Sequence, residues 1–190
     1  MRNLVFFMHV SIDGFVAGPN GQLNWIKIDE ELYDFIPTMT ASADMALYGR
    51  VTYELMESYW PIAGKQPDAT KHEIEHAKWY NNIPKVVLST TLKDAELNNT
   101  TVISDNITDR INEIKQQGNK NILIFGSPTA SFSLLNLGLI DEFWFFVNPI
   151  IVGEGMPLFK TVHEKVVLEL AETKTFSNGV IALHYKTKRG

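Results

Sequence analysis

LVFFMHVSIDGFVAG, residues 4–18, begins with the apolar run Leu4–Val10, which decides the class of fold. A short run without polar alternation predicts a strand covered on both faces, as at the centre of a parallel sheet. Asp13 and Gly14 interrupt the run and predict a turn where the strand ends. The run is shorter than the roughly 18 apolar residues of a membrane span, and no signal-peptide cleavage site follows it. We therefore expect a buried first strand in a cytoplasmic protein.

Similar apolar runs recur along the chain at regular intervals. They predict further strands at Met45–Tyr48, Lys85–Leu88, Asn121–Phe125 and Glu142–Asn148. Helical periodicity and capping residues predict helices at Asp29–Met39, Asp109–Gln117 and Ser127–Leu137. This alternation of strands and helices is typical of a mixed α/β sheet.

The C-terminal segment follows a different pattern. Val166–Phe176 and Val180–Lys186 flank the Asn178-Gly179 pair, which predicts an antiparallel hairpin. Ser58–Lys71 contains two prolines and a glycine, and we expect an irregular surface loop there. No internal repeat or linker divides the sequence, so residues 1–190 are expected to form one domain.

The composition excludes several classes of function. The chain has 190 residues, with 17 Lys and Arg against 22 Asp and Glu, and its net charge of -5 argues against nucleic-acid binding. It has no cysteine, which excludes disulfides, thiolate metal sites and cysteine nucleophiles.

His72-Glu73-Ile74-Glu75-His76 matches the H-E-x-x-H pattern of zinc proteases, with two histidines one helical turn apart. Its flanks are polar, however, and no third ligand is specified beyond an unsupported Glu96. We therefore expect a solvated helix with surface histidines and no metal, and a zinc hydrolase is the least favoured alternative.

Three segments have residues suited to a phosphorylated dinucleotide. Gly49–Glu54 and Phe125–Pro128 each join a strand to a helix, where free N–H groups attract phosphate, and Arg50 adds a charge. Leu88–Thr91 is rich in hydroxyls and is followed by Lys93. Each segment alone is ordinary capping or turn chemistry. All three, however, follow predicted strands, and open α/β sheets bind ligands at the carboxyl ends of strands.

Several motifs together resemble a known family. Ser11–Gly18, Leu23–Trp25 and Gly49–Glu54 resemble the dihydrofolate-reductase superfamily. Asp141-Glu142 and Pro149–Phe159 are similar to its riboflavin-pathway branch, the C-terminal reductase domain of the deaminase-reductase (RibD C-terminal type), which also occurs as stand-alone bacterial proteins. The resemblance implies a three-layer fold with a twisted, mostly parallel sheet and helices on both faces. It also implies NADPH as hydride donor and a homodimer.

The resemblance also implies roles for individual residues. The loop Ile12–Trp25 would close over the nicotinamide, with Trp25 and Gly153 near the substrate. The cofactor would contact Ala17, Gly49, Arg50, Thr52, Ser89, Thr90, Gly126 and Ser127.

The proton source is left open between Asp13, Glu31 and water. Glu31 matches the acid on the first helix of folate reductases, but it also belongs to an acidic first turn that suits the helix dipole. Asp13 lies in the loop motif, where an Asp-Gly turn is an equal explanation.

We expect an NADPH-dependent reductase that transfers hydride to a C=N or C=O of a small heterocycle or sugar-derived imine, resembling 5-amino-6-(5-phosphoribosylamino)uracil reductase. The alternatives are a dihydrofolate reductase and a non-catalytic dimeric nucleotide-binding protein. The alternating aromatics Phe143–Phe146 indicate that one face of their strand needs a covering helix or a subunit interface.

Overall fold

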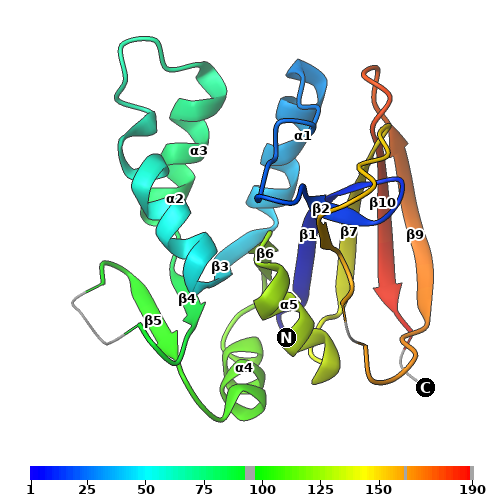
Figure 1. Ribbon diagram of the computed structural model, residues 1–190. Helices are drawn as coiled ribbons and strands as arrows, with labels where there is room; N and C mark the ends of the chain where they lie inside the picture. Colours follow the sequence, from blue (N-terminus) through cyan, green and yellow to red (C-terminus); the bar gives the residue numbers. More distant parts are fainter. Residues whose placement is uncertain (93–96, 161, 189–190) are drawn as a thin grey trace.

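The computed structural model describes residues 1–92, 97–160 and 162–188 (Figure 1). β1 (Leu4–Ser11) is buried along its whole length and lies parallel to both of its neighbours, β6 (Asn121–Phe125) and β7 (Glu142–Asn148). It therefore occupies the centre of the sheet, as its unbroken apolar run predicts.

The main sheet has eight strands in the order β5-β4-β3-β6-β1-β7-β10-β9. Its remaining strands are β3 (Ala43–Gly49), β4 (Lys85–Leu88), β5 (Thr100–Ile103), β9 (Leu168–Thr175) and β10 (Ile181–Thr187). The first six strands of this order, β5-β4-β3-β6-β1-β7, are parallel to one another. The β9–β10 hairpin adds two antiparallel strands at one edge. The mostly parallel sheet with a C-terminal hairpin is confirmed. Strand β5 is an addition to the predicted set.

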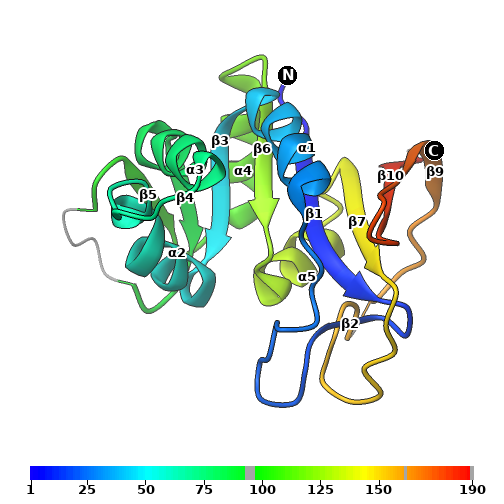
Figure 2. The ribbon, with the colours of Figure 1, turned by 90° about the horizontal axis from the view of Figure 1, so that it is seen from above.

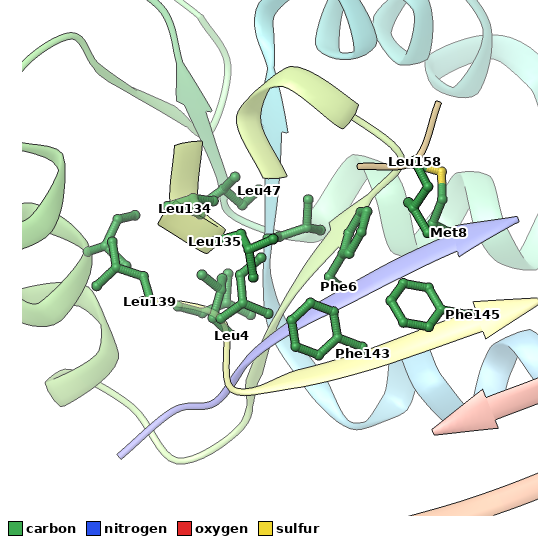
Figure 3. Packing of buried hydrophobic residues seen from close by; sticks show 14 of the residues in the cluster. Leu4, Phe6, Met8, Leu47, Leu134, Leu135, Leu139, Phe143, Phe145 and Leu158 are labelled. Atoms are coloured by element: carbon green, nitrogen blue, oxygen red, sulfur yellow. The ribbon is translucent and has the colours of Figure 1, made fainter. Parts of the chain in front are cut away.

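Helices cover both faces of the sheet, which confirms the three layers (Figures 1 and 2). One face packs against Ile111 of α4 (Ile107–Gln116) and Leu134 of α5 (Pro128–Asn136), and Figure 3 shows part of this core. The other face packs against α1 (Glu30–Ala41), α2 (Arg50–Ala63) and α3 (Lys71–Asn82). No helix of the described ranges is long and apolar enough to cross a bilayer.

The prediction of an irregular loop from Ser58 to Lys71 is wrong for its first part, because α2 continues to Ala63. Pro61 lies in the last turn of this helix, where it removes one hydrogen bond close to an end. Trp60 holds that turn in place, since its indole N–H donates to Met56 Sδ at 3.1 Å and its ring packs 4.1 Å from that of His76.

The chain itself covers both faces of the aromatic strand β7. Phe143 and Phe145 pack edge-on against Phe6, with ring centroids 6.3 and 6.2 Å apart. Trp144 and Phe146 face α1, where the ring of Phe35 lies 5.5 and 6.2 Å away. None of the four aromatics of β7 is more than 9% exposed, so the subunit-interface interpretation of this strand is wrong. The homodimer stays a prediction, which light scattering on a sizing column tests.

Candidate functional site

A cavity of about 540 Å³ lies at the carboxyl ends of β3, β4 and β6. It brings together six residues that the sequence predicts to contact a cofactor, namely Gly49, Arg50, Thr52, Ser89, Thr90 and Ser127. They gather here because parallel strands end at the same edge of a sheet. Gly126 precedes Ser127 and is not itself part of the lining, and neither is Ala17.

Two helix N-termini open onto this cavity and are joined to each other. Gly49 caps α2 without a side chain, so the first N–H groups of the helix lack an intrahelical or capping partner. The Gly49 N–H donates to Ser127 Oγ at 3.0 Å, which fixes the start of α2 against the start of α5. Gly126 and Ser127 both have positive φ angles, of 59° and 55°, and this turn points α5 toward the cavity. Both ends place positive dipole charge where a phosphate can bind.

Arg50 supplies the positive charge of the described cavity lining and is held by a neighbouring carboxylate. Its Nη1 donates to both oxygens of Glu54, at 2.9 and 2.8 Å. The two side chains are 42% and 49% exposed, so the ion pair is weak and a phosphate can replace the carboxylate. Lys93, the other cation expected here, lies outside the described residues.

The third segment is a hydroxyl-rich turn after β4. Ser89 Oγ accepts hydrogen bonds from the N–H groups of Thr91 and Leu92, at 3.2 and 2.9 Å, which makes a compact turn. Thr90 is exposed and lines the cavity. This turn therefore offers hydroxyl groups on the far side of the cavity from α5.

Two loops that are distant in the sequence, segments 11–18 and 150–158, pair with each other at the carboxyl end of β1. We call this pair of loops the clasp. Its strands β2 (Phe15–Ala17) and β8 (Met156–Pro157) pair antiparallel, and Figure 2 shows the two loops side by side. Asp13 fastens them, because its carboxylate accepts hydrogen bonds from the N–H groups of Val152 and Gly153 at 3.1 and 2.7 Å. Met156 extends from the clasp into the cavity lining.

The two predicted acids act as hydrogen-bond acceptors in this structure. Asp13 also accepts from the Ser11 hydroxyl, and these hydrogen bonds lower its pKa. The Ser177 N–H, at 2.9 Å, and Lys174 lower the pKa of Glu31 in the same way. Neither side chain lines the cavity. Both are held in the charged form, which suits a positioning role better than proton donation, and their catalytic role stays a prediction.

The two predicted substrate residues also lie outside the cavity lining. The Trp25 indole N–H donates to the carbonyl of Gln22 at 3.1 Å, within its own loop. Gly153 has a φ of 80° and gives its N–H to Asp13 in the clasp. Their contact with a substrate stays a prediction.

Sequence reasoning missed a buried polar pair beside this site. His9 of β1 is 9% exposed and Asn148 of β7 is fully buried, and they contact each other across the two strands. The signal was present in the sequence, because each is a polar residue in an otherwise apolar or aromatic run. Buried polar side chains are uncommon and call for a specific partner.

Most of α3 is exposed, but the two histidines of the H-E-x-x-H match are more enclosed than the sequence predicts. His72 and His76 are half-buried between α3 and its neighbours, and the ring of His72 lies 4.1 Å from that of Tyr33. Glu73 is engaged in a capping box with Thr70 at the start of α3. In the described ranges no three His, Cys, Asp or Glu side chains gather as a metal site, and Glu96 falls outside those ranges.

His9 and His76 predict a pH-dependent stability of the fold. Burial lowers the pKa values of His9 and His76 from 6.5 to about 4. Below pH 6.5 the unfolded chain takes up protons that the folded protein does not, so stability is complete above pH 6.5 and falls toward pH 4. His9 alone contributes about 1.4 kcal/mol per pH unit in this range. Urea unfolding at pH 7, 6 and 5 measures the slope, and H9Q should flatten it; an equal slope in H9Q would contradict the assignment.

Comparison with known proteins shows the family. The sequence profile of the RibD C-terminal domain family matches residues 2–182. The chain belongs to this family. The chain is similar to the uncharacterized protein YyaP of Bacillus subtilis (strain 168). The two sequences are 33% identical over 188 residues, which cover 97% of this chain and 94% of the relative.

Solved structures share the fold of this RibD C-terminal domain. A pyrimidine reductase-like protein of Corynebacterium diphtheriae superposes with a TM-score of 0.68 at 18% identity, over 100% of this chain and 93% of the other. Dihydrofolate reductase of Enterococcus faecalis, in complex with NADP(H) and RAB-propyl, gives a TM-score of 0.65 at 16% identity, over 98% of this chain and 97% of the other. The dihydrofolate-reductase-like fold is therefore confirmed.

Proposed function

We propose that the protein is an NADPH-dependent reductase that transfers hydride to a C=N or C=O of a small heterocyclic or sugar-imine substrate. The observation that carries the proposal is the cavity, in which two helix N-termini, an arginine and a hydroxyl-rich turn meet at one sheet edge. This combination suits a ligand with several phosphates. Membership of the RibD C-terminal domain family supports the same class of activity.

The strand order gives the proposed cofactor a direction. The hydroxyl-rich turn follows β4 and suits the adenosine ribose, while the N-termini of α2 and α5 follow β3 and β6 and suit the phosphates. Since the order in the sheet is β4-β3-β6-β1, the nicotinamide end would lie beyond β6, at the end of β1. When bound there, NADPH would supply the hydride. The clasp begins at this point and would exclude water from the reacting atoms.

The relatives suggest the class of substrate. A longer Thermotoga maritima protein is named as a diaminohydroxyphosphoribosylaminopyrimidine deaminase and 5-amino-6-(5-phosphoribosylamino)uracil reductase, and this chain covers 57% of it with a TM-score of 0.67 and 13% identity. We infer a related substrate with a planar ring and a reducible C=O or C=N. Dihydrofolate reduction is the second candidate, favoured by the likeness to the Enterococcus faecalis enzyme.

Titration with NADPH tests the proposal. Binding should quench tryptophan fluorescence and raise the melting temperature, since a ligand that binds only the folded state stabilises it. Oxidation of NADPH at 340 nm is then followed with 5-amino-6-(5-phosphoribosylamino)uracil and with dihydrofolate. Binding without turnover of either substrate would favour a non-catalytic nucleotide-binding protein. Absence of NADPH binding would overturn the proposal.

The pair Arg50 and Glu54 gives predictions of opposite sign. R50A removes a charge-assisted phosphate contact and should weaken NADPH binding by at least about 1.5 kcal/mol. E54Q removes the carboxylate that competes for Arg50, so affinity should stay the same or rise. Isothermal titration at low salt measures both variants, and an unchanged affinity in R50A would refute the phosphate assignment.

A further inference from the structure

Backbone groups fix the orientation of the buried Asn148 amide. Its Oδ1 accepts the N–H of Lys27 at 2.8 Å, and its Nδ2 donates to the carbonyl of Phe146 at 3.0 Å. A backbone N–H can only donate and a carbonyl can only accept, so the oxygen and nitrogen of the amide cannot be exchanged. Nδ2 also lies 3.3 Å from Nδ1 of His9. The group that faces His9 is therefore a donor.

This contact determines the tautomer of His9. Because Asn148 donates, Nδ1 must accept and carries no proton. Burial lowers the pKa of His9 to about 4, so the ring is neutral at pH 7 and its proton is on Nε2. Within the described chain Nε2 has no hydrogen-bond partner. The side chain is more than nine-tenths buried, but Nε2 is not among the fully enclosed polar atoms, so a ligand can reach this donor.

His9 lies where the proposed reaction would take place. It is on β1, two residues before the strand ends at Ser11, and its neighbours in the sheet are β6 and β7. Gly126, from the phosphate side of the site, donates its N–H to the carbonyl of Phe7, and the side chains of Phe7 and His9 lie on the same face of β1. The ring of His9 packs beside those of Phe7 and Phe146, at 5.6 and 5.2 Å between centroids. A donor framed by aromatic rings is suited to a planar ligand.

We propose that the Nε2–H of His9 binds the substrate, as a fixed neutral donor to the carbonyl oxygen or imine nitrogen that is reduced. This deepens the proposed function and rests on it. As hydride from NADPH forms the new bond to carbon, the π electron pair of the C=O or C=N moves onto that oxygen or nitrogen, which takes a proton from water. The hydrogen bond strengthens as this charge develops. The site therefore selects planar conjugated substrates with an acceptor atom and disfavours those that present only donors.

Two substitutions separate recognition from packing. In H9Q the amide can accept from Asn148 and still donate to the substrate, whereas H9L keeps apolar volume and loses both functions. H9L should lower kcat/KM by about tenfold or more, while H9Q should retain most of it. NADPH affinity and melting temperature are measured in both variants. Full activity in H9L, or an equal loss in a folded H9Q, would overturn the proposal.

Imidazole ¹⁵N NMR of the unaltered protein tests the geometry independently of activity. The expected pattern is a protonated Nε2 and an unprotonated Nδ1, and the probe 5,6-diaminouracil, which has two carbonyl acceptors, should shift Nε2 in the presence of NADP⁺. The opposite tautomer, or an unmoved Nε2 in protein that binds NADP⁺, would overturn the role of His9. Loss of nucleotide binding with the expected tautomer would instead overturn the proposed reductase function.

Discussion

D141A is expected to lower the free energy of unfolding by about 3–5 kcal/mol, because it leaves a buried ammonium without its counter-ion. Lys115 is 3% exposed and forms an ion pair with Asp141. Lys115 Nζ also donates to the carbonyl of Leu139, at 3.2 Å. Asp141 also accepts the N–H of Leu4 at 2.7 Å, so the substitution releases the first residue of β1 as well. Urea unfolding monitored by tryptophan fluorescence measures the loss.

A double variant distinguishes the buried charge from a general packing defect. D141A/K115M removes both ions, and it should be more stable than D141A because no charge remains uncompensated. The exposed pair Lys188 and Glu169, 60% and 62% exposed, serves as a surface control, and E169A should change stability by less than about 1 kcal/mol. Equal stabilities of D141A and the double variant would contradict this account.

G155A is expected to reduce kcat/KM by about 100-fold through displacement of the clasp. A Cβ at this position would lie 2.1 Å from the carbonyl oxygen of Ala17, and φ is 149°, so the backbone itself must move. The pairing of β2 with β8 would be lost, and with it the cover over the end of β1. NADPH affinity should change less, because Met156 is the one residue of the clasp in the cavity lining, whereas the phosphate segments Gly49–Thr52 and Gly126-Ser127 belong to other elements.

The control for this variant is G138A, in the turn after α5. Gly138 also has a positive φ, of 65°, but no atom lies within 4 Å of the added Cβ. The G138A variant therefore carries the conformational cost of replacing a glycine with positive φ, but no steric clash. Turnover close to the unaltered protein is expected for G138A, and normal turnover in G155A would show that the clasp does not shape the reaction site.

The sequence predicts those parts of the fold that depend on local pattern. Apolar runs identify the parallel strands, and the Asn178-Gly179 turn identifies the hairpin. β2 and β8 escape prediction because strands of three and two residues have no recognisable periodicity and are defined by their pairing. The end of α2 was misplaced because Pro61 is read as a helix breaker, although a proline in the last turn costs little.

For the candidate site, too, the sequence predicts the location of segments but not the state of individual side chains. The segments around Arg50, Ser89 and Ser127 could be located because the ends of parallel strands share one edge. The states of Asp13 and Glu31 could not, because their hydrogen-bond donors come from segments distant in the chain. The tautomer of His9 depends on Asn148, whose orientation is set by a carbonyl of its own strand and by the N–H of Lys27 from a distant segment.

The clasp also bears on the order in which parts of the protein fold. Asp13 and Gly153 are 140 positions apart, so their hydrogen bond closes one of the longest loops in the molecule. We expect a contact of such high sequence separation to form late in folding, because closing a long loop costs chain entropy. During synthesis, residues 11–18 leave the ribosome early but must wait for residues 150–158 before they can pair. Residues 11–18 are therefore among the first to be synthesised, but they can pair only after residues 150–158 have been made. A nascent chain that ends before residue 150 cannot form the clasp.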